Sequence, residues 1–347
     1  MEEKTQAQAQ MLANRLQKRF AHLKKWAQRT GAGAFRLYDR DIPEIPLVLD
    51  YYGGLSMPRE AAISGALYKR PYEKDDDDED RWLSAMKDSA ALALEIDPAR
   101  IFLKRRQRQK GSSQYERMGE ARFIKIVSEG GLAFKVNLSD YLDTGLFPDK
   151  RLLRAMIRAE AAGKRVLNLF SYTGSFSVYA ASGGAAGTDS VDLSNTYLSW
   201  ARENFSLNGF SANLLQQRDF FSKSGSGAHR LIRADALDFL EKAAAAKTRW
   251  DIIILDPPVF SNSKKMSGSF DLRRDIAGLL GKCISLLSSG GKIFLSVNTR
   301  RSAITQAELK ADLSQYTKNI RLTDFSDKII DEDFKGRKIP KAFSITL

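Results

Sequence analysis

Two patterns of hydrophobic and polar positions divide the chain near residue 140. In the first part, hydrophobic residues recur at three- and four-residue steps over residues 5–30, which predicts one long amphipathic helix. Its apolar face consists of Leu12, Leu16, Phe20, Leu23 and Trp26. A second helix is expected over 81–95, and alternating residues predict strands at 35–39, 46–52 and 101–110 and in a hairpin around Gly130 and Gly131. We therefore expect an N-terminal helix over residues 1–33 and a small α+β domain over residues 34–140.

Strands and helices alternate from residue 165 onward. Short apolar runs predict strands at 165–170, 187–192, 229–235, 250–256 and 290–298, followed by two more near 319–325 and 342–347. This alternation predicts a doubly wound α/β domain over residues 141–347, with a mostly parallel sheet covered on both faces. The very apolar strand 250–256 is expected near the centre of the sheet. Segment 210–228 interrupts the alternation, and we expect it to be a solvent-exposed loop.

Polar residues stand where four of these strands end. The first strand leads into a strand-to-helix turn over residues 168–175 with a single glycine, Gly174, and the next three strands end in Asp192, Asp235 and Asp256. Ligands of such folds bind at the carboxyl ends of the strands. There, Asp192 could accept bonds from a ribose diol and Asp235 from an adenine amine. Each aspartate alone could equally be a helix N-cap. Together the four segments describe an adenosine pocket beside a pocket for a planar substrate, and the single glycine disfavours a dehydrogenase.

This arrangement is that of class I S-adenosylmethionine methyltransferases, and the resemblance goes further. NLFSYTGSFSVYAA, VDLSNTYLSWARENFSLNG, HRLIRADALDFL and DPPVFSNSKKM resemble the C-terminal half of the bacterial bifunctional 23S rRNA guanine methyltransferases, the half that methylates guanine N7. The resemblance implies a Rossmann-like class I methyltransferase domain with a mostly parallel seven-stranded sheet, preceded by a small α+β domain. It implies S-adenosylmethionine as cofactor and 23S rRNA, or a large-subunit precursor, as partner.

Two departures from that family concern its other half and one motif. The family's N2-guanine methyltransferase half, with its THUMP domain, has no counterpart here. The chain is therefore expected to be either a stand-alone version or an excised part of such an enzyme, with a separate or fused N2-guanine methyltransferase as a candidate partner. The family's TGLFLDHR appears here as TGLFPDKR, with Pro148 and Lys150 in place of Leu and His. A role of that histidine therefore does not transfer to this chain.

The turn residues, the strand ends and the resemblance together give the expected cofactor site. Thr144 and Phe147 enter through the resemblance alone. The expected cofactor-binding residues are Thr144, Phe147, Asn168, Phe170, Tyr172, Thr173, Gly174, Asp192, Leu193, Ser194, Asp235, Ala236 and Asp256.

The single cysteine separates two chemistries. Methylation of cytosine C5 needs a cysteine nucleophile, but Cys283 lies in the apolar helix pattern IAGLLGKCISLL, where core packing is expected. Guanine N7 carries a lone pair and no proton, so it can attack the methyl group directly without a base. We expect Phe260 to stack on the target guanine, and Asp256, Pro257 and Pro258 to shape its pocket. A buried, packing role for Phe260 is the alternative.

Charge points to a polyanionic partner. The chain carries 55 Lys and Arg against 42 Asp and Glu, a net charge of +13. If KRRQRQK is extended, four cations share one face, suited to phosphates or to protecting an edge strand. The expected RNA-binding residues are Lys104, Arg106, Arg108, Lys110, Lys264, Lys265, Arg300 and Arg301. The acidic run at 73–80 is expected to be a solvated loop.

Composition excludes several other classes. One cysteine and two histidines exclude a disulfide framework and a Cys- or His-based metal centre, so no metal is expected. No apolar run is long enough for a membrane span, and the N-terminus lacks a signal-peptide core, which predicts a soluble, cytoplasmic protein. Two alternatives stay open beside the guanine N7 enzyme, namely a cytosine C5 rRNA methyltransferase and a non-catalytic RNA-binding assembly module.

Overall fold

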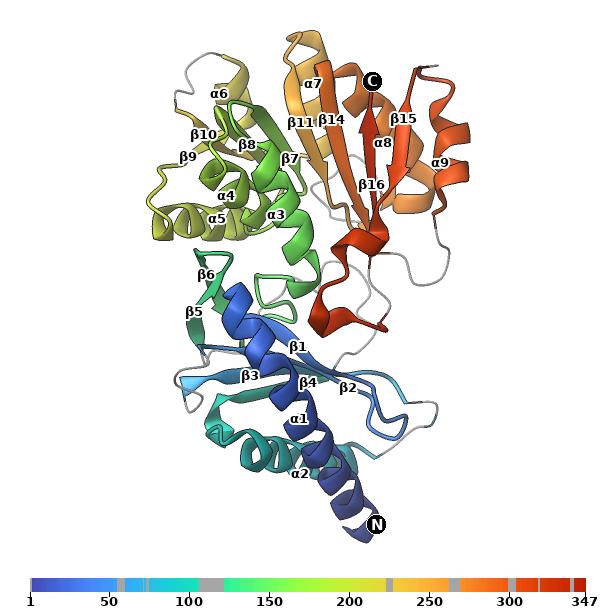
Figure 1. Ribbon diagram of the computed structural model, residues 1–347. Coiled ribbons are helices and arrows are strands. Elements are labelled where there is room, and N and C mark those ends of the chain that lie inside the picture. The colour runs from blue at the N-terminus through green and yellow to red at the C-terminus, as the bar shows by residue number, and fades with distance from the viewer. Residues whose placement is uncertain are drawn as a thin grey trace. The chain divides into compact units, whose positions relative to one another are not determined.

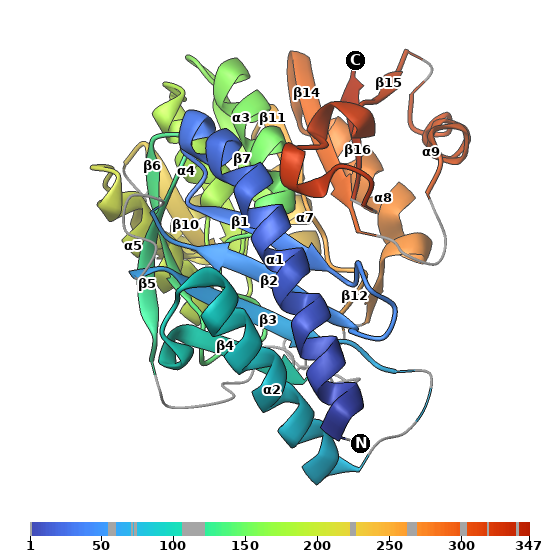
Figure 2. The ribbon, with the colours of Figure 1, turned by 60° about the horizontal axis from the view of Figure 1, so that its bottom comes forward.

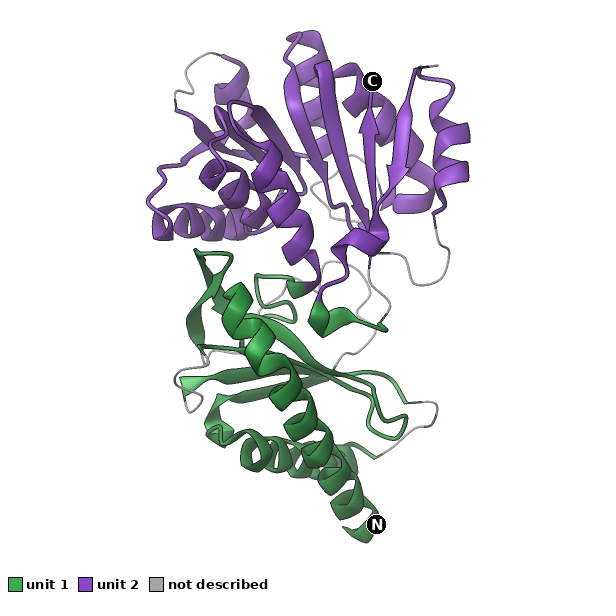
Figure 3. Cartoon of the chain, viewed as in Figure 1, with its two compact units in different colours: residues 1–148, 332–337 green, residues 149–331, 338–347 purple. Residues whose placement is uncertain are grey.

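The computed structural model divides the chain into two compact units. One consists of residues 1–148 with 332–337, and the other of residues 149–331 with 338–347 (Figure 3). The structure describes residues 2–54, 60–70, 72, 75–105, 122–222, 227–261, 269–298, 304–317, 319–337 and 340–347.

The first unit is a four-stranded sheet with two long helices packed on it. Its elements are α1 (Glu2–Thr30), β1 (Ala34–Asp39), β2 (Leu47–Tyr52), β3 (Ala62–Leu67), α2 (Asp76–Leu94), β4 (Ile101–Arg105), β5 (Ile124–Glu129) and β6 (Leu132–Asn137). The sheet has the order β1-β2-β3-β4, and α1 and α2 lie side by side along it (Figure 2). The predicted apolar face of α1 is almost entirely buried, so this helix belongs to the core of the unit and is not a separate domain.

Three details of the first unit differ from the sequence-based expectation. Strand β3 was not predicted, and β5 pairs with β6 in a two-stranded sheet of its own instead of completing the larger one. Helix α2 begins at Asp76, inside the acidic run that was expected to be a loop. Asp75 caps the helix by accepting the N–H groups of Asp77 and Asp78, and acidic side chains stabilise the positive end of the helix dipole.

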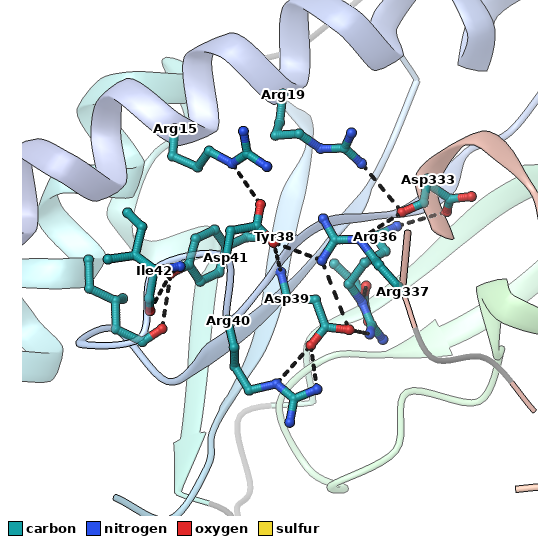
Figure 4. A network of polar contacts seen from close by, with 12 residues as sticks. Arg15, Arg19, Arg36, Tyr38, Asp39, Arg40, Asp41, Ile42, Asp333 and Arg337 are labelled. Atoms are coloured by element: carbon teal, nitrogen blue, oxygen red, sulfur yellow. Dashed lines mark hydrogen bonds and ion pairs between the residues drawn. The ribbon is translucent and has the colours of Figure 1, made fainter. Parts of the chain in front are cut away.

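A hook from the end of the sequence, residues 332–337, completes the first unit (Figure 4). Its Asp333 is fully buried and accepts a hydrogen bond of 2.9 Å from the backbone N–H of Arg36 in the edge strand β1. Arg337 donates to the carbonyl of Asp333 at 3.1 Å and pairs with Asp41 at 3.0 Å. The Arg36 guanidinium lies 5.2 Å from the centre of the Phe334 ring. The hook thus covers an N–H that an edge strand would otherwise leave unsatisfied.

The second unit is a three-layer α/β domain (Figure 1). Its strands are β7 (Arg165–Leu169), β8 (Gly187–Asp192), β9 (Asn213–Gln216), β10 (His229–Arg233), β11 (Trp250–Leu255), β14 (Leu287–Val297), β15 (Arg321–Asp324) and β16 (Lys341–Thr346). They form one sheet in the order β15-β16-β14-β11-β7-β8-β10-β9. All neighbours are parallel except β16, which runs antiparallel to both β14 and β15. The predicted α/β fold is confirmed, with β11 near the centre, but the sheet has eight strands and not seven.

Helices cover both faces of this sheet because its central strand β11 is apolar on both sides. The helices are α3 (Arg151–Glu160), α4 (Ser175–Ser182), α5 (Asn195–Leu207), α6 (Gln217–Phe221), α7 (Ala236–Ala245), α8 (Leu272–Ser285) and α9 (Gln306–Leu313). Along β11, Ile252 and Ile254 pack with α3 and α4, whereas Ile253 and Leu255 pack with α7, α8 and α9. This alternation is the two-sided burial expected of a parallel strand.

Segment 210–228 is not only a loop. Residues 213–216 form β9, the edge strand that pairs with β10, and α6 follows at once. Phe220 of α6 is buried in the main core, with its ring centre 5.3 Å from that of Phe239. The expectation of a solvent loop was therefore wrong. The polar composition of the segment obscured a short edge strand and the buried ring of Phe220.

Among the residues described, no helix is long and apolar enough to span a membrane.

We expect Asp333→Ala to destabilise the protein by about 1–3 kcal/mol, because it leaves the buried N–H of Arg36 without an acceptor. Urea unfolding followed by tryptophan fluorescence measures the loss. Asp327→Ala, at an exposed aspartate a few residues earlier, is the matched control and should change the stability by less than about 0.5 kcal/mol. Equal effects of the two substitutions would contradict the structural role of the hook.

Candidate active site

The register of four adjacent parallel strands brings the predicted residues to one edge of the second unit. Leu255 of β11 pairs with Leu169 of β7, and Leu169 pairs with Val191 of β8. The residues that follow these three, Asp256, Phe170 and Asp192, therefore leave the sheet at the same level. Strands β10 and β8 are likewise in register at their ends, so Asp235 follows on the same edge. Successive strands lie about 4.8 Å apart, which makes this row a site of ligand size.

The turn after β7 has an unusual backbone. Phe170, Tyr172 and Gly174 have φ angles of +57°, +49° and +73°, in the left-handed region that non-glycine residues rarely adopt. Side chains hold the conformation in place: the Tyr172 ring packs edge-on against Tyr197 at 4.5 Å, and the Asn204 amide donates to the carbonyl of Thr173 at 2.9 Å. Strain of this kind, kept by its surroundings, is typical of binding sites.

Gly174 is required for a second reason besides its backbone angle. A Cβ at this position would lie 2.8 Å from the Cβ of Ala201 in α5, so the turn can approach that helix only with glycine there. Next to it, Asn168 is buried and donates to Ser177 of α4 at 2.9 Å. Asn168 therefore joins the end of β7 to the helix that follows the turn.

Asp192 ties the turn to the next strand. Its two carboxylate oxygens accept the N–H groups of Tyr172 and Ser194, each at 2.9 Å. Removal from water raises the pKa of the Asp192 carboxyl to about 6, although the backbone donors, including Leu193, act in the opposite direction. A carboxylate offers about four acceptor positions, so Asp192 keeps some capacity to accept a ligand hydroxyl.

Asp235 caps the helix that follows it with only one of its two carboxylate oxygens. Its Oδ1 accepts the N–H groups of Leu237 and Asp238, at 2.9 and 3.1 Å, at the start of α7. Within the described part of the chain, Oδ2 of Asp235 accepts no hydrogen bond. The N-cap and the adenine contact expected from the sequence are thus compatible. Ala236, next in the chain, is buried.

Asp256 forms an ion pair that sequence analysis did not anticipate. The ammonium group of Lys150 lies 2.7 Å from Oδ1 of Asp256 and also donates to the hydroxyl of Ser296 in β14. The charge of the Asp256 carboxylate is therefore compensated by Lys150, and its expected part in the guanine pocket stays a prediction.

The loop after Asp256 exposes an aromatic ring. Pro257 is buried and Pro258 is partly so, whereas Phe260 is 52% exposed at the start of the short strand β12 (Phe260–Ser261). This strand pairs with β13 (Phe270–Asp271), which fixes the backbone of Phe260. Core packing, the alternative considered for Phe260, is therefore wrong, and the ring is available to a ligand.

The predicted RNA-binding residues fare differently. Lys104 is 8% exposed; its ammonium group donates to the carbonyl of Tyr141, and burial lowers its pKa to about 8. It does not share an exposed stripe, so its predicted phosphate contact is wrong. The other seven predicted positions, Arg106, Arg108, Lys110, Lys264, Lys265, Arg300 and Arg301, lie outside the described residues.

Two predicted cofactor residues belong to the first unit. The Thr144 hydroxyl hydrogen-bonds to that of Tyr52 at 2.8 Å, and Phe147 is exposed at the surface. Their proposed place at the cofactor stays a prediction.

Comparison with known proteins decides the family. Residues 60–313 match the family described as S-adenosylmethionine-dependent methyltransferase. The chain belongs to this family. The fold and cofactor expected from the sequence are thereby confirmed.

Individual relatives show which methyltransferases the chain is similar to. The chain is 42% identical over 333 residues to "Ribosomal RNA large subunit methyltransferase K" of Neisseria meningitidis serogroup B, covering 96% of this chain and 86% of that protein. It is 43% identical over 302 residues to "Ribosomal RNA large subunit methyltransferase K/L" of Methylococcus capsulatus, covering 87% of this chain but only 38% of the relative. A methyltransferase crystal structure described as complexed with SAH superimposes with a TM-score of 0.70 at 25% identity, over 98% of this chain and 82% of the other.

The groups at the strand ends suit S-adenosylmethionine. Asp192 offers paired acceptors for the ribose hydroxyls, Oδ2 of Asp235 an acceptor for the adenine amine, and the left-handed turn at 170–174 an approach for a ligand. The buried hydroxyl of Ser171 in this turn hydrogen-bonds to none of the described residues and can serve a ligand. Sequence analysis gave Ser171 no role although it lies in the predicted turn, and it noted Lys150 only as a departure from the family's motif.

Cofactor affinity should fall at acidic pH. The Asp192 carboxyl, with a pKa near 6, is ionised at pH 7.5 and mostly protonated at pH 5, and a protonated carboxyl loses acceptor capacity for the ribose. We expect S-adenosylhomocysteine affinity, measured by calorimetry, to drop about tenfold per pH unit below 6.

The folding stability of the cofactor-free protein should decrease as pH rises, the opposite of the change in cofactor affinity. The folded pKa of Asp192 lies above the model value of 3.8, so the native state without cofactor holds a proton between about pH 4 and 6 and loses stability as pH rises through that window. Asp192→Asn is the control for the affinity measurement, and it should bind weakly with no such pH dependence. Constant wild-type affinity from pH 7.5 to 5 would contradict the assignment of Asp192 to the cofactor.

Proposed function

We propose that this protein methylates N7 of a guanine in 23S rRNA of the large ribosomal subunit, using S-adenosylmethionine. The name of the Neisseria relative supports the substrate, because the similarity covers nearly all of both chains. The resemblance of the strand-end motifs to the N7-methylating half of the bifunctional enzymes supports the atom.

The position of the only cysteine carries the choice of chemistry. Cys283 is fully buried in α8 among core residues, and burial raises the pKa of its thiol. A thiol so placed cannot add to a pyrimidine, which methylation of cytosine C5 requires. Guanine N7 needs no nucleophilic side chain and no proton acceptor, and the strand ends provide neither a thiol nor a histidine.

The residues of the site then have simple tasks. When bound, S-adenosylmethionine supplies a methyl group made electrophilic by its sulfonium. The exposed Phe260 ring stacks on the guanine, and the Pro257 and Pro258 backbone, which lacks N–H groups, limits movement of the loop. The protein thus contributes mainly orientation, placing N7 in line with the methyl group.

The form of the RNA follows from the groove in which N7 lies. The major groove of an RNA duplex is too deep and narrow for side chains, so the target guanine must be unpaired or turned out of the helix. We propose that the basic segments around 106–110, 264–265 and 300–301 hold the flanking phosphates. Because the K/L relatives are much longer than this chain, a separate or fused N2-guanine methyltransferase with a THUMP domain is the proposed partner. The proposed place of action is the cytoplasm.

Phe260→Ala should reduce kcat/KM for RNA about 10- to 100-fold, because stacking on a base contributes about 1–3 kcal/mol. S-adenosylhomocysteine affinity, measured by calorimetry, should stay unchanged. The matched control is Val259→Ala, since Val259 is the adjacent residue and is similarly exposed. Full turnover by the Phe260 variant would remove the stacking role without removing the methyltransferase.

Cells lacking the protein should lose one 7-methylguanosine from 23S rRNA, and the purified protein should restore it in vitro. Mass spectrometry of digested rRNA measures both. A product of 5-methylcytidine would show the cytosine C5 alternative to be correct. Cofactor binding without any methylation of rRNA or of pre-ribosomal particles would favour the non-catalytic assembly module.

A further inference from the structure

A buried lysine, Lys150, contacts Asp256 at the edge of the sheet that carries the candidate site. Lys150 precedes α3 and is only 4% exposed. Its ammonium group has two partners in the described part of the chain, Oδ1 of Asp256 and the hydroxyl of Ser296. Leu255 pairs with Leu295, so Asp256 and Ser296 follow at the same level of the neighbouring strands β11 and β14. The lysine therefore spans the carboxyl ends of two strands.

The ion pair lies at the carboxyl ends of the strands, where such folds bind ligands. Asp256 keeps 21% of its side chain exposed, and its Oδ2 accepts no hydrogen bond from the described residues. One oxygen of the carboxylate thus accepts from the lysine, which also donates to Ser296, while the other oxygen has no partner among the described residues. A buried lysine without such a partner would be costly, so the contact fixes both side chains.

We propose that Lys150 is a positioning residue for methyl transfer: it fixes the Asp256 carboxylate and cancels the charge of that carboxylate beside the sulfonium of the bound cofactor. An uncompensated carboxylate there would stabilise the sulfonium most before the reaction, when its charge is complete. Since the positive charge leaves the sulfur during transfer, such ground-state stabilisation would raise the barrier. The inference rests on methyl transfer and not on which RNA atom receives the group.

Comparison of two ligands isolates this effect. S-adenosylmethionine and S-adenosylhomocysteine differ in the methyl group and its positive charge, so the ratio of their affinities reports the charge near the sulfur. We expect Lys150→Met to raise the preference for S-adenosylmethionine at least about fivefold, because Asp256 is then uncompensated. Lys150→Arg, which keeps the charge, should leave the ratio within about twofold. Calorimetry without RNA measures both affinities.

Further variants separate charge from packing. Lys164→Met removes the same charge from an exposed lysine at the opposite end of β7 and should not change the ratio. Asp256→Asn alone should lower the preference, and the Lys150→Met/Asp256→Asn double variant should return it toward the wild-type value. If Lys150→Met does not fold, the comparison of Asp256→Asn with the double variant gives the same test.

Turnover provides the second readout. Lys150→Met should lower kcat about tenfold or more with little change in KM for RNA, and Asp256→Asn on that background should restore part of kcat. An unchanged affinity ratio in Lys150→Met, or in the double variant relative to Asp256→Asn, would overturn the proposal. A product other than 7-methylguanosine would contradict the proposed function but leave the affinity ratio as a test of Lys150.

Discussion

Parallel pairing in register is the constraint on which the site depends. Strands β11, β7 and β8 end at one level, and so the residues that follow them meet whatever their separation in the sequence. The strands are held there by burial on both faces, with Ile252 and Ile253 entering opposite layers of the core. A slip of one residue would exchange these faces and also move Asp256 away from Asp192. Core packing and site geometry are therefore specified by the same hydrogen bonds.

Sequence patterns predicted what is local or periodic. The strong alternation from 165 onward gave the α/β unit and its strand ends, and the period of α1 gave its buried face. Contacts between distant segments were not predictable in this way. Lys104 lies in a strongly cationic run, yet its own side chain turns inward to a carbonyl group. The partner of Asp256 was hidden for the same reason, since Lys150 lies 106 positions earlier.

The chemistry of the site depends on compensated and uncompensated charge. Among the described residues, Asp192 accepts only from backbone N–H groups, and removal from water raises the pKa of its carboxyl to about 6. Asp256, by contrast, has a lysine at 2.7 Å. Two carboxylates on one edge of the sheet thus have different partners, backbone N–H groups for Asp192 and a lysine for Asp256. This difference suits the proposed binding of a sugar and a cationic reacting group at one edge of the sheet.

The hook gives the small unit an unusual order of completion during synthesis. The carboxylate that accepts the N–H of Arg36 belongs to Asp333, which is synthesised 297 residues after this position of strand β1. Until residues 332–337 exist, the edge of the first sheet is open to pairing with other chains, a known route to aggregation. Synthesis of the first unit therefore begins before that of the second unit. Residues 332–337, which complete the first unit, are made only after most of the second unit. A nascent chain that stalls late would carry a nearly complete methyltransferase domain and an unprotected strand.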